Sequence, residues 1–387
     1  MSETLINQER LAHLQQVTAA DVAAGRYYGA VIAVARRGRV VMHEAIGYAD
    51  AARTQPLQRD SVFSIFSVTK ALTNVLVLRA IELGRFALTT RVSEVVPAFS
   101  GRGREAISIF HLLTHTSGLP IVFAIKPDMY IDRLDEMVAA VCDNIFPAEP
   151  PGEGVAYSPL ANHVLLGEAL RRTDPQRRSY RAIVQEDLLD PLQMRDTSVG
   201  LRRDLRARHV VPDLRGNFPI SHPGHGNLGP NGAFQEEDAE MPWVGVASTV
   251  PDMLRFAEML RRRGELEGAR ILSPATLTLA TRNWTGEKPN ELTRTRYEQR
   301  GWPPEPAYMG LGFALRGTAI CHHLFGTLAS PGTFGNHGAG STLYWIDPER
   351  DLSFVGLTAG VMDSLDNIER FQRLSDIVIS AATAEAA

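Results

Sequence analysis

Hydrophobic residues recur at helical spacing near both ends of the chain. In residues 4–25 the apolar positions lie on one face of a helix, and the pattern ends before Gly25. Residues 365–382 show the same periodicity toward the other end, with apolar positions at Ile368, Phe371, Leu374, Ile377 and Val378. Both segments predict amphipathic helices.

Short apolar runs bounded by turn residues lie next to these helices. Residues 29–48 predict a β-hairpin whose turn is Arg36-Arg-Gly-Arg39. Three more strands are predicted near the other end, with the turn Pro348-Glu-Arg-Asp351 between the last two: residues 309–315, 341–346 and 352–357. Strands at both ends of the chain predict one sheet that is assembled from both termini.

The middle of the chain is predominantly helical in pattern. The strongest helix follows Ser67 and ends at Gly84, a suitable C-terminal cap. Another helix, over residues 251–263, follows Ser248-Thr249 as the N-cap candidate, whereas the Gly-, Pro-, His- and Asn-rich residues 210–240 predict a loop. The fold class expected is α/β of the α+β kind, with helices flanking the antiparallel sheet. We expect two domains. Residues 1–68 and 301–387 together form the sheet domain, and residues 69–300 form an inserted, mainly helical domain. The active site is expected between them.

Composition narrows the class of protein. The 387 residues are 44% apolar and 22% charged, as in ordinary globular proteins, and the net charge of −4 argues against a nucleic-acid partner. The apolar runs are too short to span a bilayer, so no membrane association is expected. Two cysteines cannot form a disulfide framework, and the polar residues 1–10 do not resemble a secretion signal, so we expect a cytoplasmic protein. The oligomeric state stays open.

Lysine is rare in this chain, which makes each lysine a candidate for chemistry. Of the 40 basic residues only three are lysines, at positions 70, 126 and 288. Arginine keeps its proton at any cellular pH, whereas a buried lysine can lose it. Lys70 follows Ser67 by three residues at the start of the strong helix, so the amine and the hydroxyl share a face. A serine hydroxyl needs a neighbouring base to become a nucleophile, and Lys70 could be that base.

Several segments in order resemble the serine β-lactamase and penicillin-binding-protein superfamily, within it the class C β-lactamase-like branch and its family VIII carboxylesterases. The resemblance covers about residues 29–357. The segments that carry it are Phe66-Ser-Val-Thr-Lys70, which is an S-x-x-K motif, His111-Leu-Leu-Thr-His-Thr-Ser-Gly-Leu-Pro120, Tyr157-Ser158, Gly245-Val-Ala-Ser-Thr249 and Asn336-His-Gly-Ala-Gly340. The resemblance implies a β-lactamase-like fold without a cofactor.

The resemblance also implies roles for individual residues. Ser67 would be the acylated nucleophile, Lys70 its activating neighbour, and Tyr157 a general base as phenolate or a proton relay with Lys70. A phenolate would need a nearby cation to lower its pKa. His337-Gly338-Ala339 would replace a Lys-Thr-Gly-type triplet beside the nucleophile. The N–H of Gly340 would join that of Ser67 in the oxyanion hole.

Two departures from the family pattern bear on the substrate. Pro159 stands where β-lactamases place an asparagine two residues after the tyrosine, and His337 stands where they place a lysine. Both changes favour neutral small-molecule esters over lactams and peptides. The function expected is therefore a serine carboxylesterase. A β-lactamase, a D-amino-acid amidase or peptidase, an acyltransferase and a non-enzymatic binding protein remain alternatives. Residues 118–130, the 210–240 loop and Trp243 are expected to shape the substrate pocket.

Other motifs do not point to chemistry of their own. His111 and His115 have a zinc-compatible spacing, but no glutamate follows His111 as in a metalloprotease. The pair His222 and His225 and the segment Cys321-His-His323 lack the further ligands of a closed zinc site, so no metal is expected. The chain contains neither a G-x-S-x-G elbow nor a phosphate-binding loop.

Overall fold

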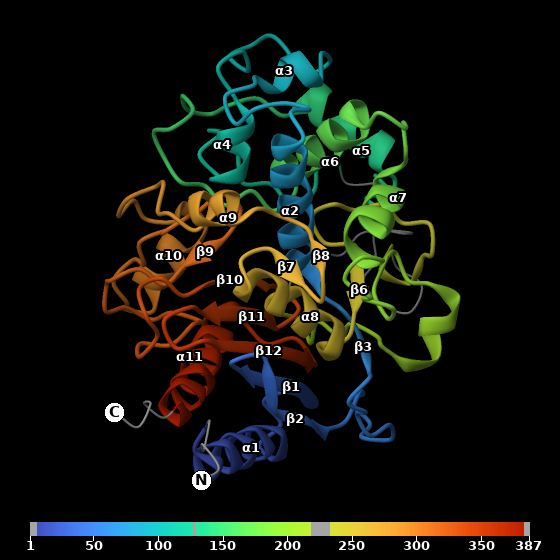
Figure 1. The fold of residues 1–387 in the computed structure, drawn as a ribbon. Helices are drawn as coiled ribbons and strands as arrows, with labels where there is room; N and C mark the ends of the chain where they lie inside the picture. Colours follow the sequence, from blue (N-terminus) through green and yellow to red (C-terminus); the bar gives the residue numbers. More distant parts are fainter. Residues whose placement is uncertain (1–5, 127–128, 218–232, 383–387) are drawn as a thin grey trace.

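The computed structural model describes residues 6–126, 129–217 and 233–382. Its largest sheet has six strands in the order β2-β1-β12-β11-β10-β9, and every neighbouring pair is antiparallel. The strands are β1 (Gly29–Arg36), β2 (Arg39–Gly47), β9 (Ala314–Leu315), β10 (Phe334–Gly338), β11 (Thr342–Asp347) and β12 (Leu352–Ala359). The first and last strands, β1 and β12, pair in the middle of the sheet, so the prediction of a sheet built from both ends is confirmed (Figure 1).

The helices predicted at the two ends lie together on one face of this sheet. Helix α1 (Gln8–Ala23) packs against α11 (Ser364–Ala381), and Figure 1 shows both next to the chain ends. An isolated bridge joins Ile6 to Ala382, and Asn7 N–H donates to Ala381 O over 2.8 Å. The two described ends of the chain are therefore in direct contact.

Helix α8 (Val250–Arg261) covers the opposite face and packs against β1, β11 and β12. Strand β1 is buried throughout: Ala30, Ile32 and Val34 join the core under α1 and α11, whereas the intervening side chains join the larger core toward α8 and α2. Burial on both faces explains why β1 is an unbroken apolar run. Because α8 falls within residues 69–300 and yet packs on the sheet, the proposed domain boundaries stay a prediction.

Helix α2 (Thr69–Glu82) is buried along most of its length (Figure 1). The further helices are α3 (Val92–Val95), α4 (Ile109–Leu113), α5 (Leu134–Asn144), α6 (Ala161–Thr173), α7 (Tyr180–Val184), α9 (Pro274–Ala280) and α10 (Glu291–Gln299), with the short helices η1 (Phe66–Val68), η2 (Gln185–Leu189), η3 (Arg203–Arg208) and η5 (Ala233–Gln235). Of these, α6, α7, η1 and η2 pack against α2. As predicted, Gly84 follows the end of α2 and has a left-handed φ of +69°. The side chain of Thr249 caps α8.

Two features of the sheets were not predicted. A second sheet has the order β4-β6-β3-β5, with β3 (Val62–Ser64), β4 (Ser198–Val199), β5 (His209–Val210) and β6 (Val246–Ser248), and a ribbon pairs β7 (Glu265–Leu266) with β8 (Ala269–Arg270). The strand predicted over residues 309–315 is wrong except for β9, because Gly312 has φ +85° and its backbone passes against the Asn74 side chain. No helix in the described ranges is long and apolar enough to cross a membrane.

Candidate active site

Ser67 lies in the tight turn that joins β3 to α2. The preceding residue, Phe66, has φ +51°, a left-handed conformation that is costly for a residue with a side chain. Its ring stacks on Phe234 with 4.8 Å between the centroids. Phe66 and Val68 are buried while Ser67 between them is partly exposed, so the turn presents the Ser67 hydroxyl to the adjoining cavity.

Lys70 is one turn further along and lies within hydrogen-bonding distance of the serine. Its Nζ is 3.0 Å from Ser67 Oγ and 2.9 Å from Trp243 O. The side chain is 2% exposed, and no carboxylate among the described residues forms an ion pair with it. Burial lowers the pKa of Lys70 well below 10.5. A neutral amine beside the hydroxyl can accept its proton, as the sequence predicted.

Tyr157 completes the group just before α6. The centroid of its ring is 5.2 Å from Lys70 Nζ and 4.6 Å from the centroid of the His115 ring. Burial raises the pKa of Tyr157 to about 12, and its hydrogen bond with Ser67 lowers that pKa by less. Burial thus favours the phenol form of Tyr157, and it also lowers the pKa of Lys70, the cation that would stabilise a phenolate. A phenol can relay a proton, and the two roles expected of Tyr157 stay predictions.

Residues 337–340 lie at the end of β10 and pack against the turn of the nucleophile. A Cβ at Gly338 would lie 2.6 Å from Ile65 O, and a Cβ at Gly340 would lie 2.2 Å from Phe66 Cδ2. Only glycine fits at either position. His337 faces the cavity, and its pKa is lowered, first by its enclosure and then by Lys70. The structure thus brings together all seven residues that the sequence nominated for the site.

A cavity of about 200 Å³ opens over Ser67 and is lined mainly by apolar side chains. Trp243 is on its wall as predicted, together with Phe123 from residues 118–130 and Asn217 and Phe234 from the 210–240 loop. The parts of these two loops at residues 127–128 and 218–232 lie outside the described residues. The apolar side chains on the wall are Phe66, Phe123, Ile131, Pro159, Leu160, Phe234, Trp243, Val244, Leu292, Leu324, Met362 and Ile368.

The histidines considered as zinc ligands have structural roles instead. His111 Nδ1 accepts from Ser108 N–H over 3.1 Å and caps α4, and His115 Nδ1 accepts from Ser158 N–H over 3.0 Å. His323 Nδ1 accepts from Phe325 N–H over 3.1 Å. His222 and His225 lie outside the described residues. Within the described ranges no group of three or more His, Cys, Asp or Glu side chains could hold a metal ion.

Two charged residues on the cavity wall were missed. Arg296 of α10 donates to Ser364 Oγ over 2.9 Å. Glu305 accepts a hydrogen bond from Tyr297 Oη over 2.7 Å, and burial raises the pKa of Glu305 to about 7. Glu305 stands alone in a proline-rich segment, Pro303-Pro-Glu-Pro306, and belongs to no motif, so the sequence offered no signal for it.

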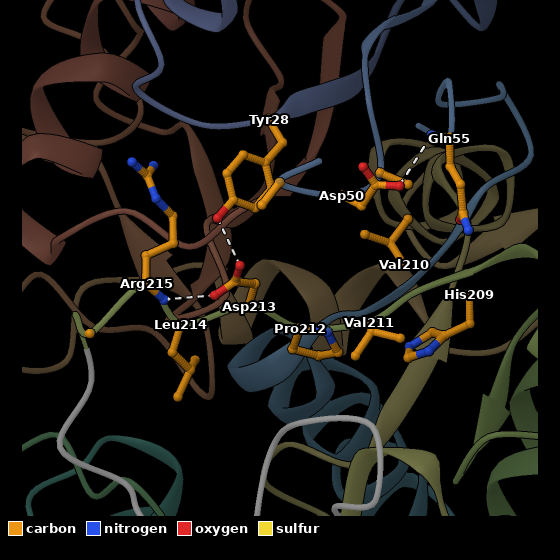
Figure 2. Close-up of a pocket in the computed structure, with 13 residues that line it drawn as sticks. Tyr28, Asp50, Gln55, His209, Val210, Val211, Pro212, Asp213, Leu214 and Arg215 are labelled. Atoms are coloured by element: carbon orange, nitrogen blue, oxygen red, sulfur yellow. Dashed lines mark hydrogen bonds between the residues drawn. The ribbon is translucent and has the colours of Figure 1, made fainter. Parts of the chain in front are cut away.

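Another hollow lies beside residues 209–216 and has a volume of about 600 Å³ (Figure 2). Its polar groups bind one another: Tyr28 Oη donates to Asp213 Oδ2 over 2.7 Å, and Arg215 N–H donates to Asp213 Oδ1 over 3.0 Å. Neither Ser67 nor Lys70 lines it. The reactive groups therefore belong to the smaller cavity over Ser67.

The geometry agrees with the comparisons to known proteins. The sequence profile of the β-lactamase family matches residues 14–376. The chain belongs to the β-lactamase family. Protein Rv1367c of Mycobacterium tuberculosis is 26% identical over 380 residues, which cover 86% of this chain and 86% of that protein. Esterase EstB of Burkholderia gladioli is 31% identical over 266 residues, which cover 61% of this chain and 66% of the esterase.

Solved structures share the fold of this β-lactamase-family chain. The crystal structure of a family VIII carboxylesterase superposes with a TM-score of 0.78 at 20% identity, over 96% of this chain and 97% of that one. The predicted fold class is confirmed: a mixed α/β structure with an antiparallel sheet and flanking helices. The chain therefore has the serine-hydrolase fold of the β-lactamase family, with esterases among its relatives.

Proposed function

We propose that this protein is a serine carboxylesterase that forms an acyl-enzyme on Ser67. The observation that carries the proposal is the 3.0 Å separation between Ser67 Oγ and the buried Nζ of Lys70. A neutral amine at this distance can act as the general base that a serine nucleophile needs. The depressed pKa of Lys70 favours that neutral form at physiological pH.

In acylation, Lys70 takes the proton of Ser67 while Oγ attacks the ester carbonyl carbon. The carbonyl oxygen becomes an oxyanion, and the N–H groups of Ser67 and Gly340 stabilise it. Among the turn and loop hydrogen bonds of the described residues, neither N–H donates to another backbone group. The bond from the carbonyl carbon to the alcohol oxygen then breaks, and Tyr157 and Lys70 return the proton to the departing alcohol. In deacylation the same pair takes a proton from water, whose oxygen attacks the acyl carbon. The bond from that carbon to Ser67 Oγ then breaks, and the pair returns the proton to Oγ.

Three observations support an ester rather than an amide or a lactam as the substrate. Pro159 lines the cavity and cannot donate a hydrogen bond to a substrate amide. The lowered pKa of His337 removes the fixed positive charge that a lysine would place there. A relative over much of the chain is named an esterase. The β-lactamase, amidase or peptidase, and acyltransferase activities are tested as alternatives in the experiment below.

The experiment is intact-mass spectrometry of the protein after reaction with a fluorophosphonate, alongside hydrolysis of p-nitrophenyl butyrate. We expect one adduct and ester turnover in the wild type, and loss of both in Ser67→Ala. Ser64→Ala is the matched control, since Ser64 ends β3 and its hydroxyl bonds to His209 at 3.0 Å, outside the cavity. It should retain both.

The alternatives give different results with the same preparations. Turnover of a chromogenic cephalosporin or a D-aminoacyl anilide above that of the ester would favour a lactamase or an amidase. Ester products that form from added alcohol faster than the free acid would favour acyl transfer. Ester hydrolysis that survives Ser67→Ala would overturn the mechanism, and a wild type without adduct or turnover would favour a binding protein.

A further inference from the structure

Glu305 is the only acidic residue on the described walls of two adjoining cavities at the nucleophile. The first is the cavity over Ser67. The second, about 70 Å³, lies behind it and is lined by Lys70, His115 and Asn336. Both cavities share Tyr157, His337 and Glu305. A substrate bound over Ser67 is therefore within the electrostatic reach of the Glu305 carboxylate.

The Glu305 side chain is held in a fixed position. Its Oε2 accepts from Tyr297 Oη over 2.7 Å. Tyr297 is fully buried and packs edge-on against Trp302, with 5.3 Å between the ring centroids. This donor leaves the carboxylate with lone pairs to spare, because a carboxylate can accept about four hydrogen bonds.

No cation neutralises this carboxylate. Among the described residues no arginine, lysine or histidine lies within 4.0 Å of it. Arg316 lowers the pKa of Glu305 by less than burial raises it, and its guanidinium donates to the carbonyl groups of Gly326 and Ala319 over 2.6 and 2.7 Å. Burial of Lys70 and enclosure of His337 favour their neutral forms. A partly buried carboxylate without a counterion is unfavourable, and a cationic ligand would relieve that cost.

Arg296 is the one other charged group on the wall of the larger cavity, and it has the opposite sign. Its side chain is exposed to solvent and donates to Ser364 Oγ. Water screens an exposed charge, so its effect on a ligand is weaker than that of the enclosed Glu305. The aromatic rings of Phe66, Phe234 and Trp243 on the same wall also suit a cation, because ring faces attract positive charge.

We propose that Glu305 is a specificity-determining residue that directs the Ser67 site toward esters carrying an ammonium group. This inference rests on the proposed esterase function. The ammonium group would lie against the free lone pairs of Glu305 while the ester carbonyl lies at Ser67. No step of the bond chemistry changes, since the carboxylate acts on substrate binding and not on proton transfer.

The test compares butyrylcholine with neohexyl butyrate, in which a carbon atom replaces the cationic nitrogen. Both esters have the same shape, so the ratio of their kcat/KM values measures the effect of the charge. At about pH 8.5, above the pKa of Glu305, we expect the wild type to prefer butyrylcholine by about tenfold. Glu305→Gln should bring the ratio close to one, mainly by lowering kcat/KM for butyrylcholine. Glu298→Gln removes the same charge from an exposed site on α10 and should keep the wild-type ratio.

Equal ratios in the wild type and Glu305→Gln would overturn the inference. If Glu305→Gln fails to fold, the wild type alone decides: choline and neohexanol are compared as competitive inhibitors of p-nitrophenyl butyrate hydrolysis. Choline should inhibit at about one-tenth of the neohexanol concentration, and equal inhibition would overturn the inference. If p-nitrophenyl butyrate is not hydrolysed, or is hydrolysed by Ser67→Ala, the proposed function itself fails and this inference fails with it.

Discussion

At the scale of single residues, Lys70 combines reactivity with a cost in stability. Folding buries its amine without a carboxylate partner and lowers its pKa well below 10.5. Between the folded and unfolded pKa values, the unfolded chain binds a proton that the folded protein does not. The free energy of unfolding therefore rises with pH across that window, and at lower pH the burial of Lys70 opposes folding.

Replacing Lys70 by the uncharged Met should abolish activity and stabilise the protein. We expect Lys70→Met to lose fluorophosphonate labelling by about a thousandfold, because Ser67 loses its base. Its free energy of unfolding at pH 7 should exceed that of the wild type by about 1–3 kcal/mol in urea titrations. This gap should narrow as the pH rises toward 10.5, where the unfolded lysine also becomes neutral. Lys288→Met is the control, since Lys288 is exposed and its amine donates to Gly152 O. A Lys70→Met protein less stable than the wild type would contradict the prediction.

At the scale of elements, the site depends on how closely the β10–β11 turn approaches η1. Gly340 does not have a left-handed φ, so its backbone would accept any residue. Space is the constraint, because a Cβ there would lie 2.2 Å from the ring of Phe66. Phe66 in turn fixes the position of Ser67. The turn and the nucleophile are therefore coupled through one aromatic ring.

Gly340→Ala should consequently reduce catalysis more than it reduces stability. The methyl group must displace Phe66 and with it both Ser67 and the Gly340 N–H, so we expect kcat/KM for p-nitrophenyl butyrate to fall between about tenfold and a hundredfold. Gly332→Ala is the control in the turn before β10, where a Cβ would meet its nearest atom at 3.8 Å. It should keep wild-type kinetics. Unchanged kinetics in Gly340→Ala would show that the close approach is not needed.

Helix α8 offers a contrasting element, which stabilises the fold without touching the cavity. Thr249 Oγ1 accepts from Asp252 N–H over 3.3 Å and caps the helix that covers the sheet. Thr249→Ala should lower the free energy of unfolding by about 1–2 kcal/mol and leave kcat/KM within about twofold. Thr249→Ser keeps the hydroxyl and should recover most of the stability. Equal losses in both variants would mean that the methyl packing, and not the cap, is responsible.

At the scale of the whole molecule, buried histidines should limit stability in acid. Burial lowers the pKa of His115 and His323 to about 3 and that of His209 to about 4, and it lowers that of His163 well below 6.5. Below pH 6.5 the unfolded chain binds protons that the folded protein excludes, so the free energy of unfolding falls. The loss is about 1.4 kcal/mol per pH unit for each histidine.

Urea titrations at several pH values between 7.5 and 5 measure this loss directly. The slope of the free energy of unfolding against pH should decrease in His163→Gln by the amount that corresponds to about one bound proton. His13→Gln, at an exposed position, should keep the wild-type slope. Identical slopes for all three proteins would contradict the assignment of the acid sensitivity to buried histidines.

Long elements of the fold were predictable, and short ones were not. Helices α1 and α11 have a clear helical period, and strands β1, β11 and β12 are apolar runs bounded by turns. These two signals identified the sheet and its two covering helices. The strands of the second sheet have two or three residues each, too few to show a period. Strand β10 has the sequence Phe-Gly-Asn-His-Gly, in which apolar and polar residues do not alternate. Its glycine Gly338 lies close to η1, where a larger side chain would not fit.

The site was predictable where a motif carries it. Ser67, Lys70 and Tyr157 belong to segments with recognisable spacing, and packing brings them together as expected. The protonation of Tyr157 was not predictable, because it depends on how deeply packing buries Lys70. Glu305 lies on the cavity wall because of the course of a proline-rich segment. That segment has no hydrophobic periodicity, so its position could not be predicted from the sequence.

The contact between the two ends of the chain has a consequence for the order in which the protein forms. During synthesis on a ribosome β1 emerges early, but its partner β12 is the last strand of the sheet to be synthesised. The β1–β12 pair can therefore form only late in synthesis. A circular permutant that joins the present ends by a linker and begins at Ala52, in the exposed turn after β2, would make β12, α11, α1, β1 and β2 consecutive. Its central strand pair would then be local in sequence. Such a chain should refold faster than the natural one, because closing a shorter loop costs less entropy.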